Sequence, residues 1–360
     1  MNAKRICSFL LALAVLAAAG LFVVRAAEVS RPASVWELGG WLDRAVSDAL
    51  RGKTKLDRLA PALFLRGGEQ ERNGLILADG ELIENIPAGD EDVISANTEG
   101  ILRCLETFNR PAAVMLLPTA AAIRQQKVPL TAELYNQKAM IASVYERVSG
   151  AATTVDAYTA LFSVQDEYLY YRTASNLTGL GGYYVYTALA PRLGLSAASL
   201  SDYEIENLPD DYRGDLSARA PDAEVRPDLI SLYRYTRTDR TYRVICTRGG
   251  ASYVYNTLFP MHLRLLGRPE DVLFGGAGER LEISVAAQRG SSLLLYADET
   301  AVSYLPFLAP HYRRITVVDP RKADEELLSA IDPAQYDRVI FACSVRTFSQ
   351  EPIYARLAAD

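Results

Sequence analysis

Histidine and cysteine are both scarce in this 360-residue sequence. Only His262 and His311 occur, so any mechanism that needs an imidazole base must use one of these two residues. Four cysteines are too few for a disulfide-stapled scaffold or a cysteine-rich zinc module. The three that lie beyond the N-terminal apolar run, Cys104, Cys246 and Cys343, are far apart in apolar segments, which predicts buried free thiols.

An excess of basic charge is also lacking. The 38 Lys and Arg residues are outnumbered by 44 Asp and Glu residues, which gives a net charge of −6. Binding to nucleic acid needs a concentrated basic surface, so we expect no nucleic-acid partner. No phosphate loop, dinucleotide fingerprint or metalloprotease helix occurs, so we expect neither a cofactor nor a metal. The glycines at 179–182 follow no apolar strand, which favours close backbone packing over a phosphate cradle.

One long apolar run is present, from Ile6 to Val24, directly after Lys4 and Arg5. As a helix rising about 1.5 Å per residue it would span roughly 28 Å, close to the thickness of a bilayer's hydrocarbon core. Arg25 spoils the signal-peptidase site that would end at Ala27, so an uncleaved anchor over 1–27 is favoured over a cleaved signal peptide. The positive residues before the run keep the N-terminus inside. The sequence therefore predicts a single-pass cell-membrane protein with its C-terminal domain outside the cytoplasm, and secretion is the alternative.

Apolar segments of strand length alternate with helical segments through much of the remaining chain. This alternation predicts a parallel sheet covered by helices on both faces. Between 203 and 287 the segments shorten and alternate, which is typical of antiparallel hairpins inserted into the α/β domain. Thirteen of the 21 tyrosines fall between Tyr168 and Tyr255, and half-buried strand tyrosines explain them better than a sugar-stacking surface. The expected strands are 75–78, 112–118, 152–158, 291–297, 313–320 and 337–343, and the expected helices are 97–108, 131–148, 301–312 and 324–331.

Two segments resemble the DHHW proteins, bacterial relatives of the SGNH hydrolases. LYYRTASNLTGLGGYYVY, at 169–186, is similar to the family's Tyr-Arg-Thr-Asp-His-His-Trp-Thr signature and the helix after it. LLLYADETAVSYLPFLAPHYRRITVVDPR, at 293–321, is similar to the family's strand, Asp-Ser turn and Pro-Phe-Leu-x-x-His-Tyr segment. The resemblance implies an SGNH-like three-layer α/β sandwich over 28–350, with the β-rich insertion at about 203–287 and a C-terminal tail at 351–360.

The resemblance also implies a catalytic triad, from which this chain departs. The family's catalytic serine lies in the Asp-Ser turn, and its catalytic Asp and His lie in the signature. The resemblance implies that this triad moves acyl groups on cell-envelope polysaccharide, as in alginate-acetylation proteins of the same architecture. Here Ala174 and Asn176 stand at the Asp and His positions, and Glu299 follows Asp298 where the serine is expected. An asparagine cannot accept a proton near neutral pH, and a carboxylate is a poor substitute for an alkoxide. We therefore expect a catalytically degenerate member and lean against an enzyme.

The remaining candidate residues form an expected cleft beyond the carboxyl ends of the strands, where ligands bind in open α/β sheets. This cleft consists of Arg172, Ser175, Asn176, Asp298 and Glu299. The leading hypothesis is an extracytoplasmic, membrane-tethered protein that binds cell-envelope polysaccharide or a surface protein. The alternative is an active esterase or O-acetyltransferase with a relocated nucleophile, which needs a hydroxyl within about 3 Å of a histidine nitrogen. A purely structural envelope protein is the third hypothesis.

Other polar residues near these motifs have structural explanations. His311 is expected to stabilise the end of its helix, and His262 to be half-buried on another helix. Asp298 and Glu299 are expected to stabilise a helix dipole rather than bind a cation. Asp319 and Arg321 are expected to form a structural ion pair.

Overall fold

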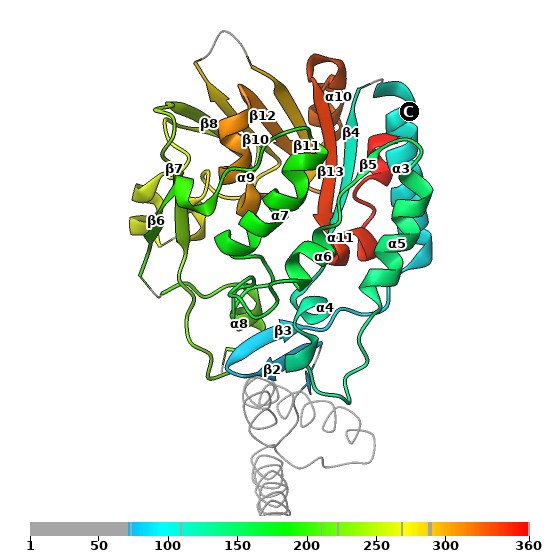
Figure 1. Ribbon diagram of the computed structural model, residues 1–360, viewed down its shortest axis with the longest axis vertical. Coiled ribbons are helices and arrows are strands. Elements are labelled where there is room, and N and C mark those ends of the chain that lie inside the picture. Colours follow the sequence, from blue (N-terminus) through cyan, green and yellow to red (C-terminus); the bar gives the residue numbers. More distant parts are fainter. Residues whose placement is uncertain are drawn as a thin grey trace, which may run out of the picture. The chain divides into compact units, whose positions relative to one another are not determined.

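An eight-stranded mixed sheet organises the computed structural model, which describes residues 71–72, 74–108, 110–209, 211–221, 223–267, 269–286 and 290–358. Its strands are β4 (Ala112–Leu117), β5 (Thr153–Thr154), β8 (Tyr242–Arg248), β9 (Ala251–Tyr255), β10 (Arg280–Val285), β11 (Ser292–Ala297), β12 (Arg314–Val318) and β13 (Arg338–Ser344). They lie in the order β5-β4-β13-β11-β12-β10-β8-β9 (Figure 1). The expected anchor at 1–27 lies outside the described residues. Within those residues, no helix is long and apolar enough to cross a membrane.

The first five strands of this order run parallel. Every residue of β11 is buried, as are five of the six residues of β4. A parallel strand covered on both faces buries its side chains on both sides, which produces the continuous apolar runs seen in the sequence. The predicted parallel sheet is therefore confirmed for this half of the sheet.

The strands between 203 and 287 are antiparallel, as expected, but most of them extend the main sheet. β10 pairs antiparallel with β12 and β8, and β8 pairs antiparallel with β9. The sheet is consequently mixed rather than parallel throughout. Two smaller antiparallel sheets accompany it, formed by β6 (Tyr203–Asn207) with β7 (Ser231–Tyr235), and by β1 (Glu71–Arg72), β2 (Leu75–Ala78) and β3 (Glu81–Glu84).

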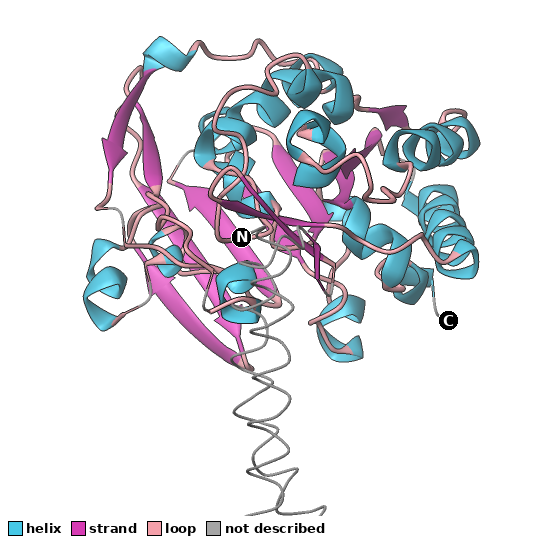
Figure 2. Cartoon of the chain, turned by 90° about the horizontal axis from the view of Figure 1, so that it is seen from below, coloured by secondary structure: helices cyan, strands magenta, loops and turns pink. Residues whose placement is uncertain are grey.

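Helices lie on both sides of the main sheet (Figure 2). They are α3 (Glu91–Phe108), α4 (Ala120–Ile123), α5 (Gln137–Val148), α6 (Ala157–Phe162), α7 (Gly179–Arg192), α8 (Asp215–Arg219), α9 (Ala301–Leu308), α10 (Glu325–Ser329) and α11 (Val345–Gln350). One group joins α6, α7 and α9, and a second joins α3, α5 and α11. This is the expected three-layer arrangement, because each helix buries an apolar face against the sheet.

Three expected element boundaries are wrong, each because a polar side chain bonds differently from the expectation. Asn97 does not cap α3, because this helix begins at Glu91 and Asn97 lies buried inside it. The Asn97 side-chain amide donates to the Phe348 and Glu351 carbonyls at 2.9 and 2.8 Å and so holds the C-terminal segment against the helix. The helix expected from 131 begins at Gln137, because the Asn136 side chain accepts from the Ala139 N–H. The strand expected at 152–158 is cut to two residues, because the Asp156 side chain caps α6.

The three cysteines beyond the N-terminal run are buried and free, as predicted. Burial raises the pKa of Cys104 to about 12. A thiol protonated at neutral pH is a poor nucleophile and a poor metal ligand. Cys104 therefore contributes apolar packing to the core and no chemistry.

Gly182 allows α7 and α9 to approach closely. A Cβ atom at this position would overlap the Ser303 carbonyl, whereas one at Gly150 would meet open space. Gly182→Ala is expected to lower the free energy of unfolding by about 1–3 kcal/mol, despite the gain in helix propensity of about 1 kcal/mol. Gly150→Ala is the matched control and should leave stability unchanged or slightly raised. Urea unfolding of both variants checks this, and equal stabilities would contradict the close approach.

Candidate functional site

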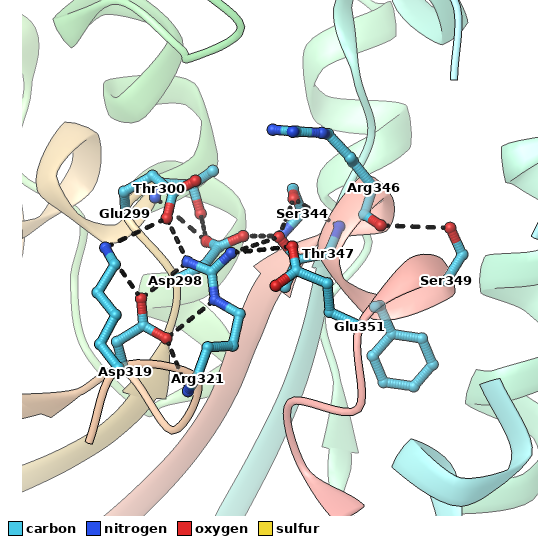
Figure 3. Close-up of polar contacts among 12 residues, drawn as sticks. Asp298, Glu299, Thr300, Asp319, Arg321, Ser344, Arg346, Thr347, Ser349 and Glu351 are labelled. Carbon is cyan, nitrogen blue, oxygen red and sulfur yellow. Dashed lines mark hydrogen bonds and ion pairs between the residues drawn. The ribbon is translucent and has the colours of Figure 1, made fainter. Parts of the chain in front are cut away.

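Polar side chains follow three neighbouring parallel strands at the edge of the sheet where their carboxyl ends meet. Asp298 and Glu299 follow β11, and Asp319 and Arg321 follow β12. Ser344 ends β13. Figure 3 shows these side chains pointing toward one another. Because the strands are parallel neighbours, the positions after them converge although they are far apart in the sequence.

Arg321 is the centre of an ion-pair network at this edge. Its side chain is 15% exposed and pairs with Glu299, with Asp319 at 2.8 Å and with Glu351 at 3.3 Å (Figure 3). Lys322 lies 3.2 Å from Asp319 and 3.7 Å from Glu299. The expected ion pair of Asp319 and Arg321 is confirmed, but the network also holds Glu299, which was expected to act on a helix dipole.

The pKa values of Asp298 and Glu299 are shifted in opposite directions. Burial, and then the neighbouring Glu299 carboxylate, raises the pKa of Asp298. Burial alone would raise the pKa of Glu299 as well, but Arg321 and Lys322 hold it below its ordinary value. Glu299 is therefore ionised at neutral pH and held in ion pairs with Arg321 and Lys322. These ion pairs make its carboxylate a poor nucleophile and a poor base.

Asp298 fastens the turn after β11 to the end of β13. Its carboxylate accepts from the Thr300 N–H at 3.1 Å, from the Thr300 hydroxyl, and from the Ser344 N–H at 2.9 Å. Thr300, the residue before α9, is thereby tied to Asp298 through both its N–H and its hydroxyl. Asp298 is 2% exposed and acts on the backbone of the turn, which is a structural role.

The signature segment is anchored by a residue that sequence reasoning missed. Asp228 is fully buried and accepts from the N–H groups of Arg172 and Thr173, both at 2.8 Å. It also accepts from the hydroxyls of Tyr168 and Thr173. These bonds fix the loop that presents residues 174–177. No local pattern around Asp228 indicated this, because its partners lie more than fifty positions earlier in the chain.

Two adjoining cavities bring the signature segment and the turn after β11 together. Asn176, Leu177, Glu299 and Thr300 line both. The larger cavity has a volume of about 140 Å³ and the smaller about 20 Å³. Asn176 of the signature segment and Glu299 of the turn after β11 therefore line the same two cavities.

The other candidate residues divide between the cavities and the core. Ser175 lines the smaller cavity, and Asp298 lies beneath the turn. Arg172 lines neither cavity; its guanidinium lies 4.4 Å from the centre of the Tyr168 ring. Ala174 is 2% exposed and packs against Gly214, which leaves no space for a larger side chain without movement.

Neither histidine lines either cavity. His311 follows α9, and its Nε2 lies 2.7 Å from the Tyr186 hydroxyl, in keeping with the expected structural role. Burial, and then Arg240, lowers the pKa of His311, so its ring is neutral at neutral pH. His262 is exposed on a 3-10 helix and lies against the Tyr255 ring, so the expectation of a half-buried histidine is wrong.

The inserted segment supplies much of the larger cavity's wall, which the sequence did not indicate. Tyr212, Tyr233 and Glu270 come from this segment and line the cavity together with Tyr171 of the signature segment. The tyrosines are buried, as expected, yet they also line a site. Among the described residues, no group of three or more His, Cys, Asp or Glu residues is placed to hold a metal ion.

A mixed α/β sheet with helices on both sides, and a cavity where a signature loop meets the turn after a central strand, defines a layered α/β protein with a candidate site at the carboxyl edge of its parallel strands. The model of the DHHW protein family matches residues 90–318, which is well over half of the chain. The chain therefore belongs to the DHHW family, and the resemblance found in the sequence is confirmed.

The first two of the following solved structures support the fold. A DHHW family protein from Eubacterium siraeum is 21% identical, with a TM-score of 0.65 over 79% of this chain and 95% of that chain. Bacillus cereus PatB1 with a sulfonyl adduct is 14% identical, with a TM-score of 0.62 over 76% of this chain and 95% of that chain. The O-acetyltransferase domain of Pseudomonas putida AlgJ is 13% identical over 77% and 93%, with a TM-score of 0.48. No curated protein matches the sequence.

Proposed function

We propose that this chain is an extracytoplasmic DHHW protein that binds cell-envelope carbohydrate and has lost acyl-transfer chemistry. The observation that carries the proposal is the state of Glu299. It occupies the position at which the family's serine is expected, and its carboxylate is held by Arg321 and Lys322. A carboxylate in such a network cannot serve as the activated nucleophile of a triad.

The lack of a histidine among the described residues that line the two cavities also supports the proposal. Asn176 takes the position of the expected histidine and lines both cavities, but an amide does not accept a proton near neutral pH. Ser175 is the relocated nucleophile that the enzyme alternative would need. Neither His262 nor His311 lines the cavities, which leaves this hydroxyl without an imidazole among the described residues.

A cavity with a wall of aromatic side chains supports carbohydrate as the ligand. Tyr171, Tyr212 and Tyr233 line it, and the rings of Tyr171 and Tyr212 lie edge to face at 5.2 Å. Aromatic rings combined with polar groups are suited to the apolar faces and hydroxyls of sugars. The N-terminal apolar run at 6–24 would hold the chain in the cell membrane with this domain outside.

To test the proposal, one preparation of the full-length protein is assayed for ester hydrolysis and for oligosaccharide binding. With p-nitrophenyl acetate we expect no hydrolysis above buffer, and no difference between the parent and the Ser175→Ala variant. On an array of envelope oligosaccharides we expect binding that Tyr233→Phe weakens several-fold, because a hydroxyl is removed from the cavity wall. Tyr235→Phe is the matched control, since Tyr235 lies on the same strand and does not line the cavity.

Two outcomes would overturn the proposal. Hydrolysis that is well above buffer and lost in Ser175→Ala would establish the esterase alternative. Binding to none of the oligosaccharides, with hydrolysis also absent, would favour a purely structural envelope protein.

A further inference from the structure

Three tyrosines of the larger cavity have hydroxyl groups without a partner among the described residues. Tyr171, Tyr212 and Tyr233 are 8%, 9% and 5% exposed, and all three line the cavity. None of their hydroxyls forms a hydrogen bond with another described residue. Their hydroxyl oxygens are not fully buried, so each can donate to and accept from a ligand. The cavity therefore presents a set of unused hydrogen-bonding groups to whatever enters it.

The charge of the same wall has one sign. Glu270, Asp271 and Glu299 line the cavity, and none of the lining residues that the structure describes is Lys, Arg or His. Asp271 pairs with Arg248 at 3.0 Å and Glu299 pairs with Arg321, in both cases with a cation that lies outside the lining. Glu270 pairs with no described residue. An anionic ligand would meet the Glu270 carboxylate, which has no compensating cation among the described residues.

We propose that this cavity takes one sugar unit that carries a free ammonium group, such as a de-N-acetylated hexosamine. The inference rests on the proposed carbohydrate-binding function. The ammonium pairs with Glu270, and the tyrosine hydroxyls bond the hydroxyls of the sugar ring. A volume of about 140 Å³ is below the roughly 300–1,000 Å³ of pockets for drug-sized ligands, which limits the occupant to a single ring.

The same chemistry argues against acidic polysaccharide. A uronate unit carries a carboxylate, and the described part of the wall offers no basic side chain to neutralise it. Like charges placed close together reduce affinity and thereby determine which ligands are rejected. The order of preference is therefore the amino sugar first, the neutral N-acetylated sugar second and the uronate last.

Calorimetric titration of the full-length protein with three trisaccharides tests this order. The probes are the glucosamine trimer, its fully N-acetylated form and the mannuronate trimer, at low salt and mildly acidic pH. We expect the glucosamine trimer to bind on the order of five- to tenfold more tightly than the N-acetylated trimer, and the mannuronate trimer not to bind. Glu270→Gln should abolish most of this preference. Glu146→Gln is the matched control, because Glu146 is exposed on α5 and lines no cavity described here.

Each other outcome overturns the inference in a distinguishable way. Equal binding of the glucosamine and N-acetylated trimers, or a preference that survives Glu270→Gln, removes the ammonium site but leaves carbohydrate binding intact. Tightest binding of the mannuronate trimer contradicts the charge argument directly. Failure of all three sugars to bind removes the inference, and the wider oligosaccharide array then decides separately whether the proposed function stands.

Discussion

Replacement of Arg321 by methionine should lower the free energy of unfolding at neutral pH by about 3–5 kcal/mol, because breaking a buried ion pair from one side leaves charge without a partner. The Arg321 side chain contacts all three of Glu299, Asp319 and Glu351. Methionine keeps much of the side-chain volume while removing the charge. Guanidinium unfolding monitored by circular dichroism measures the loss. Lys322→Met is the control: Lys322 pairs with two of the same carboxylates but is 39% exposed, so its loss should cost less than about 1 kcal/mol.

The pH dependence of the stability difference between the parent and Arg321→Met shows whether charge or packing causes it. The pKa of Glu299 is lowered in the folded protein, so this residue contributes stability above its ordinary pKa of about 4.5, and that contribution is lost as the pH falls through the lowered value. Without Arg321 the contribution disappears, so the difference in the free energy of unfolding between the parent and Arg321→Met should stay constant from pH 7 to about 4.5 and narrow below it, as the pH falls through the lowered pKa of Glu299. A difference that does not narrow below pH 4.5 would mean that packing, not charge, is responsible. Adding Glu299→Gln to the variant should recover part of the loss, since one unpaired carboxylate is then removed.

Removal of the Asp228 side chain should have the second largest effect on the fold. Asp228→Ala is expected to lower the free energy of unfolding by at least about 3 kcal/mol, since each hydrogen bond to a charged group contributes about 1.5–3 kcal/mol. Three donors of the signature segment, and the hydroxyl of Tyr168 just before it, lose their acceptor in this variant. Urea unfolding measures the loss.

A control on the same segment separates the role of Asp228 from a general effect of losing an acidic residue. Asp215 accepts from the Ser175 N–H at 2.9 Å on the exposed side of this loop. Asp215→Ala should cost about 1 kcal/mol or less. Similar losses in the two variants would contradict the anchoring role of Asp228, and oligosaccharide binding should decrease in Asp228→Ala because the wall bearing Asn176 is displaced.

Much of the fold could be predicted from the sequence because the signals are local. The strands at 112–117, 292–297, 314–318 and 338–344 were recognised from apolar runs whose length and burial on both faces are typical of a parallel sheet. The errors at Asn97, Asn136 and Asp156 share a cause. A short polar side chain can cap a helix, or bond a distant carbonyl from inside one, and the sequence alone does not distinguish these uses.

The candidate site was predicted in part, for a similar reason. Asn176 and Glu299 were placed together because residues after parallel strands meet at one edge, and a family signature marked the loop. Arg172 was placed in the cleft wrongly, since its guanidinium lies over the Tyr168 ring and its backbone is bonded to Asp228. Tyr212, Tyr233 and Glu270 were not recognised as site residues, because nothing near them in the chain indicates which surface the inserted strands face.

The sequence by itself determined the positions of the central parallel strands, the family, and the chemical groups missing from the expected triad positions. Each of these depends on the identity of a residue or on a periodicity within a short window. Only the tertiary structure decided that Glu299 is neutralised by Arg321, that Asp228 holds the signature segment, and that an acidic, tyrosine-lined cavity forms between that segment and the insertion. These features depend on which side chains meet across long separations in the chain, and the packing of the whole sheet and its helices decides that.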